Sequence, residues 1–212
     1  ITEYERGLPR LSGIVSSENL PISGTALEEL RFWKGKKETA SSAYGRLKSY
    51  WNHVGWSDGK WSPSGTPWSA AFISFLLRGQ GFPGSAAHYK YVKSAMKGKT
   101  DWRAISIPKN KGKIQVAIGD VFVKPRSGGK TNSHGDVVYK IKNGKAYLAG
   151  GNLGNTAKTI KLPVTQSNIL QDGGRYLIVL KKKPKKGPTS GMNKILAYGG
   201  FAVALALTGL LG

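Results

Sequence analysis

The chain has 212 residues and no cysteine, which sets the first limits on its chemistry. Disulfide bonds, thiolate zinc sites and a cysteine nucleophile are excluded. Histidine is scarce too, with three residues and no His-x-x-x-His or similar spacing, so a zinc site is not expected. The sequence therefore predicts neither a metal nor a cofactor.

Acidic side chains are also few, with 11 Asp and Glu against 33 Lys and Arg, which gives a formal net charge of +22. An excess of this size is typical of proteins with an anionic neighbour. Nucleic acid, anionic lipid, an acidic cell-wall polymer and an acidic partner protein all fit. Sequence-specific nucleic-acid binding is not expected, because the chain has no Cys-His finger, RNP-like strand or phosphate-binding loop.

Composition divides the chain into four segments. Residues 1–25 mix Pro, Gly and Ser and are interpreted as an extended arm, and residues 26–180 as the folded domain. Residues 181–194 form a basic linker, and residues 195–212 contain no charged residue. As a helix the last 18 residues span about 27 Å, close to the hydrocarbon thickness of a bilayer. We expect a single-pass C-terminal transmembrane anchor with its basic flank toward anionic lipid; a buried terminal helix is the alternative.

The first half of the domain predicts helices. Apolar spacing favours helix over residues 26–51, with a break near residues 34–37, and over residues 69–78 and 85–96. The third of these has a predicted inner face of His88, Tyr91, Val92, Ala95 and Met96.

The second half predicts strands. They cover residues 115–123 with an interruption at Gly119-Asp120, then residues 135–141, 146–149, 159–162 and 176–180. Asn143-Gly144 is a favoured two-residue turn that should pair two of these strands antiparallel. Helices followed by an antiparallel sheet indicate an α+β fold.

Three polar residues are candidates for chemistry. Ser69 begins an apolar helix, where the dipole and unpaired N–H groups stabilise negative charge, although a plain N-cap serine is the alternative. His134 opens a strand beside solvent, which suits a general base, although a capping or surface His is the alternative. Asn152 ends the next strand, where its side chain could orient the His134 ring; a turn Asn is the alternative.

Four motifs in chain order carry a resemblance: Trp68-Ser-Ala-Ala-Phe-Ile-Ser, Gly119-Asp-Val-Phe, His134-Gly-Asp-Val-Val and Gly150-Gly-Asn. Together they resemble the CHAP and NlpC-type, papain-like amidohydrolase superfamily. More closely, they are similar to a branch of uncharacterised bacterial and phage domains that carry Trp-Ser-Ala-Ala-Phe. The resemblance covers about residues 26–180 and implies N-terminal helices packed on an antiparallel sheet.

The resemblance implies catalytic roles for Ser69, His134 and Asn152, and cleavage of peptide or amide bonds in peptidoglycan. Trp68 and His88 are expected to contact substrate, with a packing role as the alternative for His88. This sequence has Ser where the superfamily has a Cys nucleophile, and a hydroxyl needs a better aligned base than a thiol does. Three accounts stay open: a Ser-His-Asn amidase or endopeptidase, a fold kept for binding, or a substitution introduced to trap a complex.

Two functions are therefore expected. The first is a membrane-anchored peptidoglycan hydrolase, in keeping with a phage or virion component that opens a cell envelope. The second is a catalytically inactive structural protein in a virion membrane, linking that membrane to an acidic capsid protein. The anchor and the positive charge favour the second function, and the motif set favours the first.

Overall fold

The computed structural model describes residues 22–126 and 132–184, and these form four α-helices and a six-stranded antiparallel sheet. The helices are α1 (Ile22–Trp33), α2 (Ser41–His53), α3 (Ser69–Leu76) and α4 (His88–Met96). The strands are β1 (Trp102–Ser106), β2 (Val121–Pro125), β3 (Ser133–Lys142), β4 (Lys145–Gly150), β5 (Lys158–Pro163) and β6 (Ile178–Lys182), with a short 3-10 turn at Pro108–Asn110. The α+β class predicted from the sequence is confirmed.

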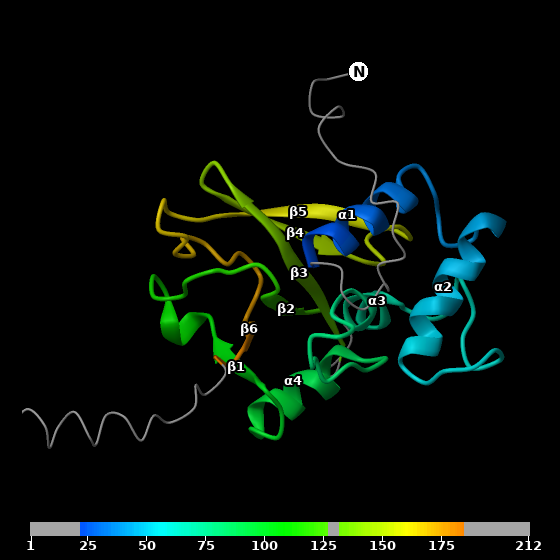
Figure 1. The fold of residues 1–212 in the computed structure, drawn as a ribbon, viewed down its shortest axis with the longest axis horizontal. Helices are drawn as coiled ribbons and strands as arrows, with labels where there is room; N and C mark the ends of the chain where they lie inside the picture. The colour runs from blue at the N-terminus through cyan, green and yellow to red at the C-terminus, as the bar shows by residue number, and fades with distance from the viewer. Residues whose placement is uncertain (1–21, 127–131, 185–212) are drawn as a thin grey trace, which may run out of the picture. The chain divides into compact units, whose positions relative to one another are not determined.

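The strands are ordered β1-β6-β2-β3-β4-β5 across the sheet. The Asn143-Gly144 hairpin is present: Val137 pairs with Ala149 and Ile141 with Ala146. The longest strand, β3, lies between β2 and β4 and runs through the centre of the molecule (Figure 1). Side chains of β3 therefore have neighbours on β2 as well as on β4.

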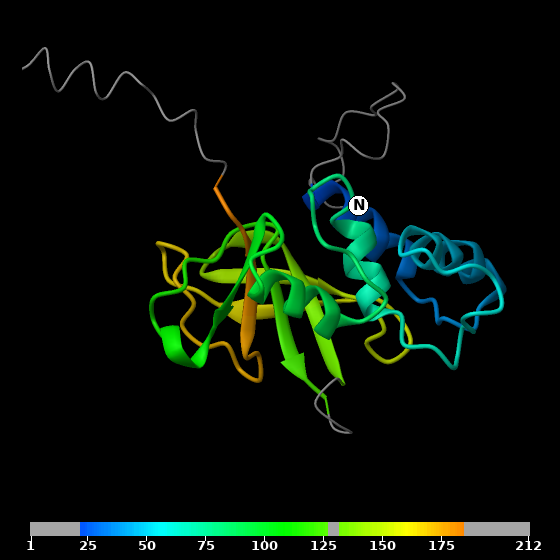
Figure 2. The ribbon, with the colours of Figure 1, turned by 90° about the horizontal axis from the view of Figure 1, so that it is seen from below.

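One face of the sheet is covered by helices. Helices α1 and α3 pack on β3 and α4 packs on β1 and β3, while α2 packs on α3 away from the strands (Figures 1 and 2). The core on this side is rich in aromatic rings, and Trp68 stacks on Trp33 with ring centroids 4.6 Å apart. Burial of such rings is a large favourable contribution to the free energy of folding.

The opposite face has its own apolar core, formed with segments between the strands. Phe122, Val138 and Val179 point to this side and pack with Ile107, Leu170 and Tyr176, among others. Because side chains alternate along a strand, β3 contributes Val137 to the helical side and Val138 to this second core. The sheet is therefore buried on both faces along β3.

Several element boundaries differ from the sequence predictions. Helix α1 begins at Ile22, inside the predicted arm, and strand β1 was not predicted. The predicted strand 115–123 is a strand only from Val121, because the Asp120 carboxylate accepts a hydrogen bond from the Ala117 N–H and closes a turn there. The last strand lies at Ile178–Lys182 rather than at 176–180. Met96, predicted to face inward, is 69% exposed because it is the final residue of α4.

No helix within residues 22–126 and 132–184 is long and apolar enough to cross a bilayer. The predicted transmembrane segment 195–212 and most of the predicted arm lie outside the described residues.

Candidate functional site

Ser69 is the first residue of α3, and Trp68 is the N-cap of this helix. The first backbone hydrogen bond of the helix runs from Phe72 N to Trp68 O, at 2.9 Å. The N–H groups of Ser69, Ala70 and Ala71 precede this bond, so they have no acceptor within the helix. Together with the helix dipole they favour negative charge beside Ser69.

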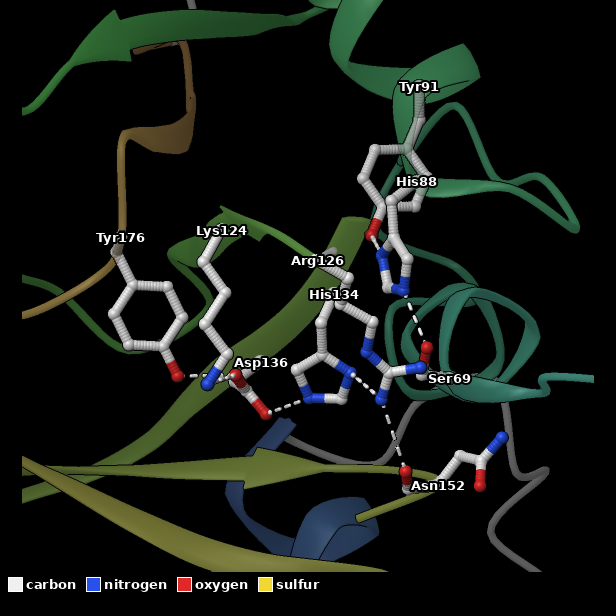
Figure 3. Close-up of polar contacts among 9 residues, drawn as sticks. All are labelled: Ser69, His88, Tyr91, Lys124, Arg126, His134, Asp136, Asn152 and Tyr176. Carbon is white, nitrogen blue, oxygen red and sulfur yellow. Dashed lines mark hydrogen bonds and ion pairs between the residues drawn. The ribbon is translucent and has the colours of Figure 1, made fainter. Parts of the chain in front are cut away.

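The hydroxyl of Ser69 contacts a histidine from another helix. Its Oγ lies 2.6 Å from Nε2 of His88, the first residue of α4 (Figure 3). The other ring nitrogen of His88, Nδ1, contacts the hydroxyl of Tyr91 one turn later on the same helix. Ser69, His88 and Tyr91 thus form a connected polar chain on the helical side of the sheet.

Burial lowers the pKa of His88 well below its ordinary value, and electrostatic interactions with His134 and Arg126 lower it further. The His88 imidazole is therefore neutral at neutral pH and carries one proton. Burial raises the pKa of Tyr91, so its phenol keeps its proton. With the proton of His88 on Nδ1, Tyr91 accepts it and Nε2 can accept the hydroxyl proton of Ser69.

A second polar cluster is centred on β3. His134 and Asp136 are two residues apart on the strand, so both side chains point to the same face. His134 Nε2 lies 3.0 Å from Asp136 Oδ1, and the Tyr176 hydroxyl donates to Asp136 Oδ2. Lys124 Nζ is 4.0 Å from the same carboxylate oxygen. His134 and Asp136 are both fully buried.

Arg126 fixes the proton of His134. Arg126 Nη2 lies 3.2 Å from His134 Nδ1 and 3.4 Å from the backbone oxygen of Asn152. A guanidinium only donates hydrogen bonds, so Nδ1 of His134 must be the acceptor. The ring proton is therefore on Nε2, from which it is donated to Asp136. Asp136, His134 and Arg126 form one directed chain of hydrogen bonds.

Two glycines leave room for side chains of these clusters. A Cβ at Gly150 would lie 1.9 Å from Asp136 Oδ1, so only glycine leaves room for the carboxylate. A Cβ at Gly135 would lie 2.8 Å from His88 Nδ1, so only glycine allows α4 to pack so closely on β3. As a result, the rings of His88 and His134 have centroids 5.9 Å apart.

A pocket of about 210 Å³ opens at Ser69. Its lining includes Ser69, His88 and Arg126, with Thr66, Asn132 and Ser133 as further polar residues and Trp51 and Trp56 as aromatic ones. A more apolar groove of about 320 Å³ shares Asn132 and Ser133 with it. Ser69 is 2% exposed and His88 4%, and both side chains line this pocket.

The structure places the five residues singled out in the sequence in different settings. Ser69 and His88 are in direct contact, whereas the hydrogen-bond partners of His134 are Arg126 and Asp136. The side chain in contact with His134 Nε2 is that of Asp136; Asn152 contributes its backbone oxygen to Arg126, and its φ of 57° is a turn conformation. Trp68, expected to contact substrate, is fully buried and donates through Nε1 to Glu38 Oε2 at 2.7 Å, so it belongs to the core.

Four residues of the site were missed in the sequence. Asp136 could have been found, because it lies two positions after His134 on a predicted strand. Tyr91 was on the predicted inner face of its helix, but without a role. Arg126 and Tyr176 carry no local signal: Arg126 meets His134 through the pairing of β2 with β3, and Tyr176 contacts Asp136 from 40 residues away in the chain. Within residues 22–126 and 132–184, no group of three His, Cys, Asp or Glu side chains could hold a metal ion.

A family model described as an uncharacterized protein conserved in bacteria, DUF2272, matches residues 24–184. The chain belongs to the DUF2272 family. The matched region begins within α1, ends just after β6 and contains every residue of the site. No curated protein and no solved structure matches the chain. For this DUF2272 domain, chemistry is therefore inferred from the geometry of its own side chains.

Proposed function

We propose that this DUF2272 domain is a serine-dependent amide hydrolase with Ser69 as nucleophile and His88 as general base. The observation that carries the proposal is the 2.6 Å contact between Ser69 Oγ and His88 Nε2 in a pocket at the start of α3. A nucleophile and a base within hydrogen-bond reach, with a third group on the other ring nitrogen, make up the general arrangement of activated serines.

The proposed reaction begins with attack of Ser69 Oγ on the amide carbonyl carbon as its proton moves to His88 Nε2. The oxyanion that forms is stabilised by N–H groups at the start of α3. His88 then gives the proton to the leaving nitrogen as the C–N bond breaks, which leaves an ester on Ser69. Water attacks this ester, its proton passes through Nε2 to Ser69 Oγ, and the acid is released.

Peptidoglycan is the proposed substrate, cleaved at a peptide or amide bond. The proposal is supported by the motif resemblance to CHAP and NlpC-type amidohydrolases and by the net charge of +22, which suits an anionic wall polymer. A serine at the start of a buried helix packed on an antiparallel sheet also agrees with a papain-like relationship. One difference is that the histidine in contact with the nucleophile comes from α4 rather than from β3.

The test uses a fluorophosphonate probe, which forms a covalent bond with activated serines, together with clearing of a peptidoglycan gel. We expect labelling at Ser69 by mass spectrometry, and loss of both labelling and clearing in Ser69→Ala and His88→Gln. Ser49→Ala is the matched control, because Ser49 lies on the exposed side of α2 and its hydroxyl donates to Gly45 O of the same helix. Absence of labelling and clearing in the folded wild-type protein would refute the hydrolase proposal.

The large positive charge favours a second candidate function. In it, the protein is structural and links a membrane to an acidic partner such as a capsid protein. Residues 195–212 are the proposed single-pass anchor, supported by 18 uncharged positions after a basic linker. Removal of residues 195–212 should release the protein from the membrane fraction without detergent. Persistence in that fraction would contradict the anchor. Salt-sensitive binding of an acidic protein by Ser69→Ala, without hydrolysis by the wild type, would favour the structural function.

A further inference from the structure

Arg126 is a cation that the hydrolase mechanism does not use. It is half-buried directly after β2 and lines the same pocket as Ser69 and His88. In Figure 3 its guanidinium lies between the His134 ring and Ser69. A ligand in this pocket would therefore lie beside both the proposed nucleophile and the positive charge of Arg126.

The hydrogen bonds of Arg126 leave most of its donors available. Both contacts use Nη2, one to His134 Nδ1 and one to the backbone oxygen of Asn152. Both of these acceptors are neutral. Within residues 22–126 and 132–184 no acceptor bonds Nη1 or Nε, so three of the five N–H donors of the guanidinium are left for a ligand.

The charge of Arg126 is not neutralised by the part of the protein that the structure describes. No carboxylate of residues 22–126 or 132–184 forms an ion pair with it; the nearby Asp136 binds His134, Tyr176 and Lys124. Its positive charge contributes to the low pKa of His88. A partly desolvated cation beside a pocket is stabilised when an anion enters.

Two further residues, His134 and Asp136, fix the position of the Arg126 guanidinium. The buried Asp136 fixes the His134 tautomer, and this tautomer presents Nδ1 to Arg126 as an acceptor. Because the guanidinium is already oriented by this chain of hydrogen bonds, it does not have to rearrange when a ligand binds. Its planar pair of N–H groups matches the two oxygens of a carboxylate.

We propose that Arg126 binds the C-terminal carboxylate of the substrate, which makes the enzyme selective for peptides cleaved at the bond next to a free C-terminus. This inference rests on the proposed hydrolase function and adds the substrate class. In this arrangement His134 and Asp136 are positioning residues for Arg126.

The binding test uses full-length Ser69→Ala, which cannot turn over, with N-acetylalanylalanine and its C-terminal carboxamide in all-L and all-D forms. By calorimetry we expect at least one form of the acid to bind about tenfold tighter than the matching carboxamide. Adding Arg126→Gln should remove this preference, and Arg126→Lys should keep only part of it, because lysine keeps the charge without the planar fork. Arg103→Gln is the control, since it removes an equal charge from an exposed position on β1.

Hydrolysis of the same pairs by the wild type separates the two proposals. If peptides are cleaved but acid and carboxamide react equally in both wild type and Arg126→Gln, the carboxylate inference is overturned while the hydrolase function stands. If the acid binds through Arg126 but nothing is cleaved, the site is confirmed as a carboxylate-binding site and the hydrolase function fails. A midpoint of thermal unfolding for Arg126→Gln within a few degrees of wild type shows that the lost preference for the acid does not come from unfolding. If Arg126→Gln does not fold, Arg126→Lys is compared with the wild type in the same way.

Discussion

His88 and His134 are both buried and their ring centroids are 5.9 Å apart, yet their surroundings give them different chemistry. His134 has an arginine on one nitrogen and a carboxylate on the other, so its proton is fixed on Nε2. His88 lies between two hydroxyl groups, each able to donate or to accept. Only His88 can exchange a proton without breaking an ionic contact.

The two histidines show that burial and proximity do not identify a general base. The partner on each nitrogen decides, because an arginine can only donate and an ionised carboxylate can only accept. We interpret His134 as part of a fixed support and His88 as the residue that moves a proton. Each experiment below is designed to break or to sharpen this difference.

The largest effect is expected from Asp136→Ala. The change removes the acceptor for two buried donors, His134 Nε2–H and the Tyr176 hydroxyl, and we expect a loss of about 3–5 kcal/mol in the free energy of unfolding. Urea denaturation measures it. Asp58→Ala is the control, because its ion pair with Lys48 is exposed and its loss should change little. A stable Asp136→Ala protein would mean that the cluster around His134 is not a structural support.

The next largest effect is expected on catalysis, where substitutions of His88 and His134 should change different kinetic constants. We expect His88→Gln to lower kcat by about 100-fold to 10,000-fold, the usual range for loss of a general base. His134→Gln should act chiefly on KM for substrates with a free C-terminal carboxylate, because it reaches the substrate through Arg126. Steady-state kinetics on one peptide with a free C-terminal carboxylate measures both. A loss of kcat in His134→Gln with a normal kcat in His88→Gln would reverse the assignment and make His134 the base.

The smallest effect concerns pH and stability. Burial lowers the pKa of His88 in the folded protein, so between that pKa and the unfolded value of about 6.5 the unfolded chain binds more protons. Stability should therefore fall as the pH drops below about 6.5, by at most about 1.4 kcal/mol per pH unit for this one group.

His88→Gln should lack this contribution, so the difference in unfolding free energy between wild type and variant should change over that pH range. Other titrating groups, such as His53 with its own lowered pKa, are common to both proteins and cancel. A difference that stays constant from pH 7 to pH 5 would show that His88 is not held neutral.

Local pattern was enough for much of the fold and for part of the site. The apolar run after Ser69 predicted α3, and Asn143-Gly144 predicted the β3–β4 hairpin, because both depend on neighbours within a few residues. Strand β1 was missed, because it is only five residues long and is paired along its length by β6, more than 70 residues later in the chain. Boundaries such as Ile22 and Ile178 likewise depended on packing rather than on propensity.

The sequence by itself determined which residue types were available: a serine at a helix start, three histidines, a large positive charge and no thiol. Only the tertiary structure decided which histidine meets the serine. Chain order and strand pattern favoured His134, but the packing of α4 across Gly135 brought His88 to Ser69 and left His134 between Arg126 and Asp136. The physical reason is that hydrogen bonds are made within about 3 Å in space, and two helices and a strand must pack before those distances exist.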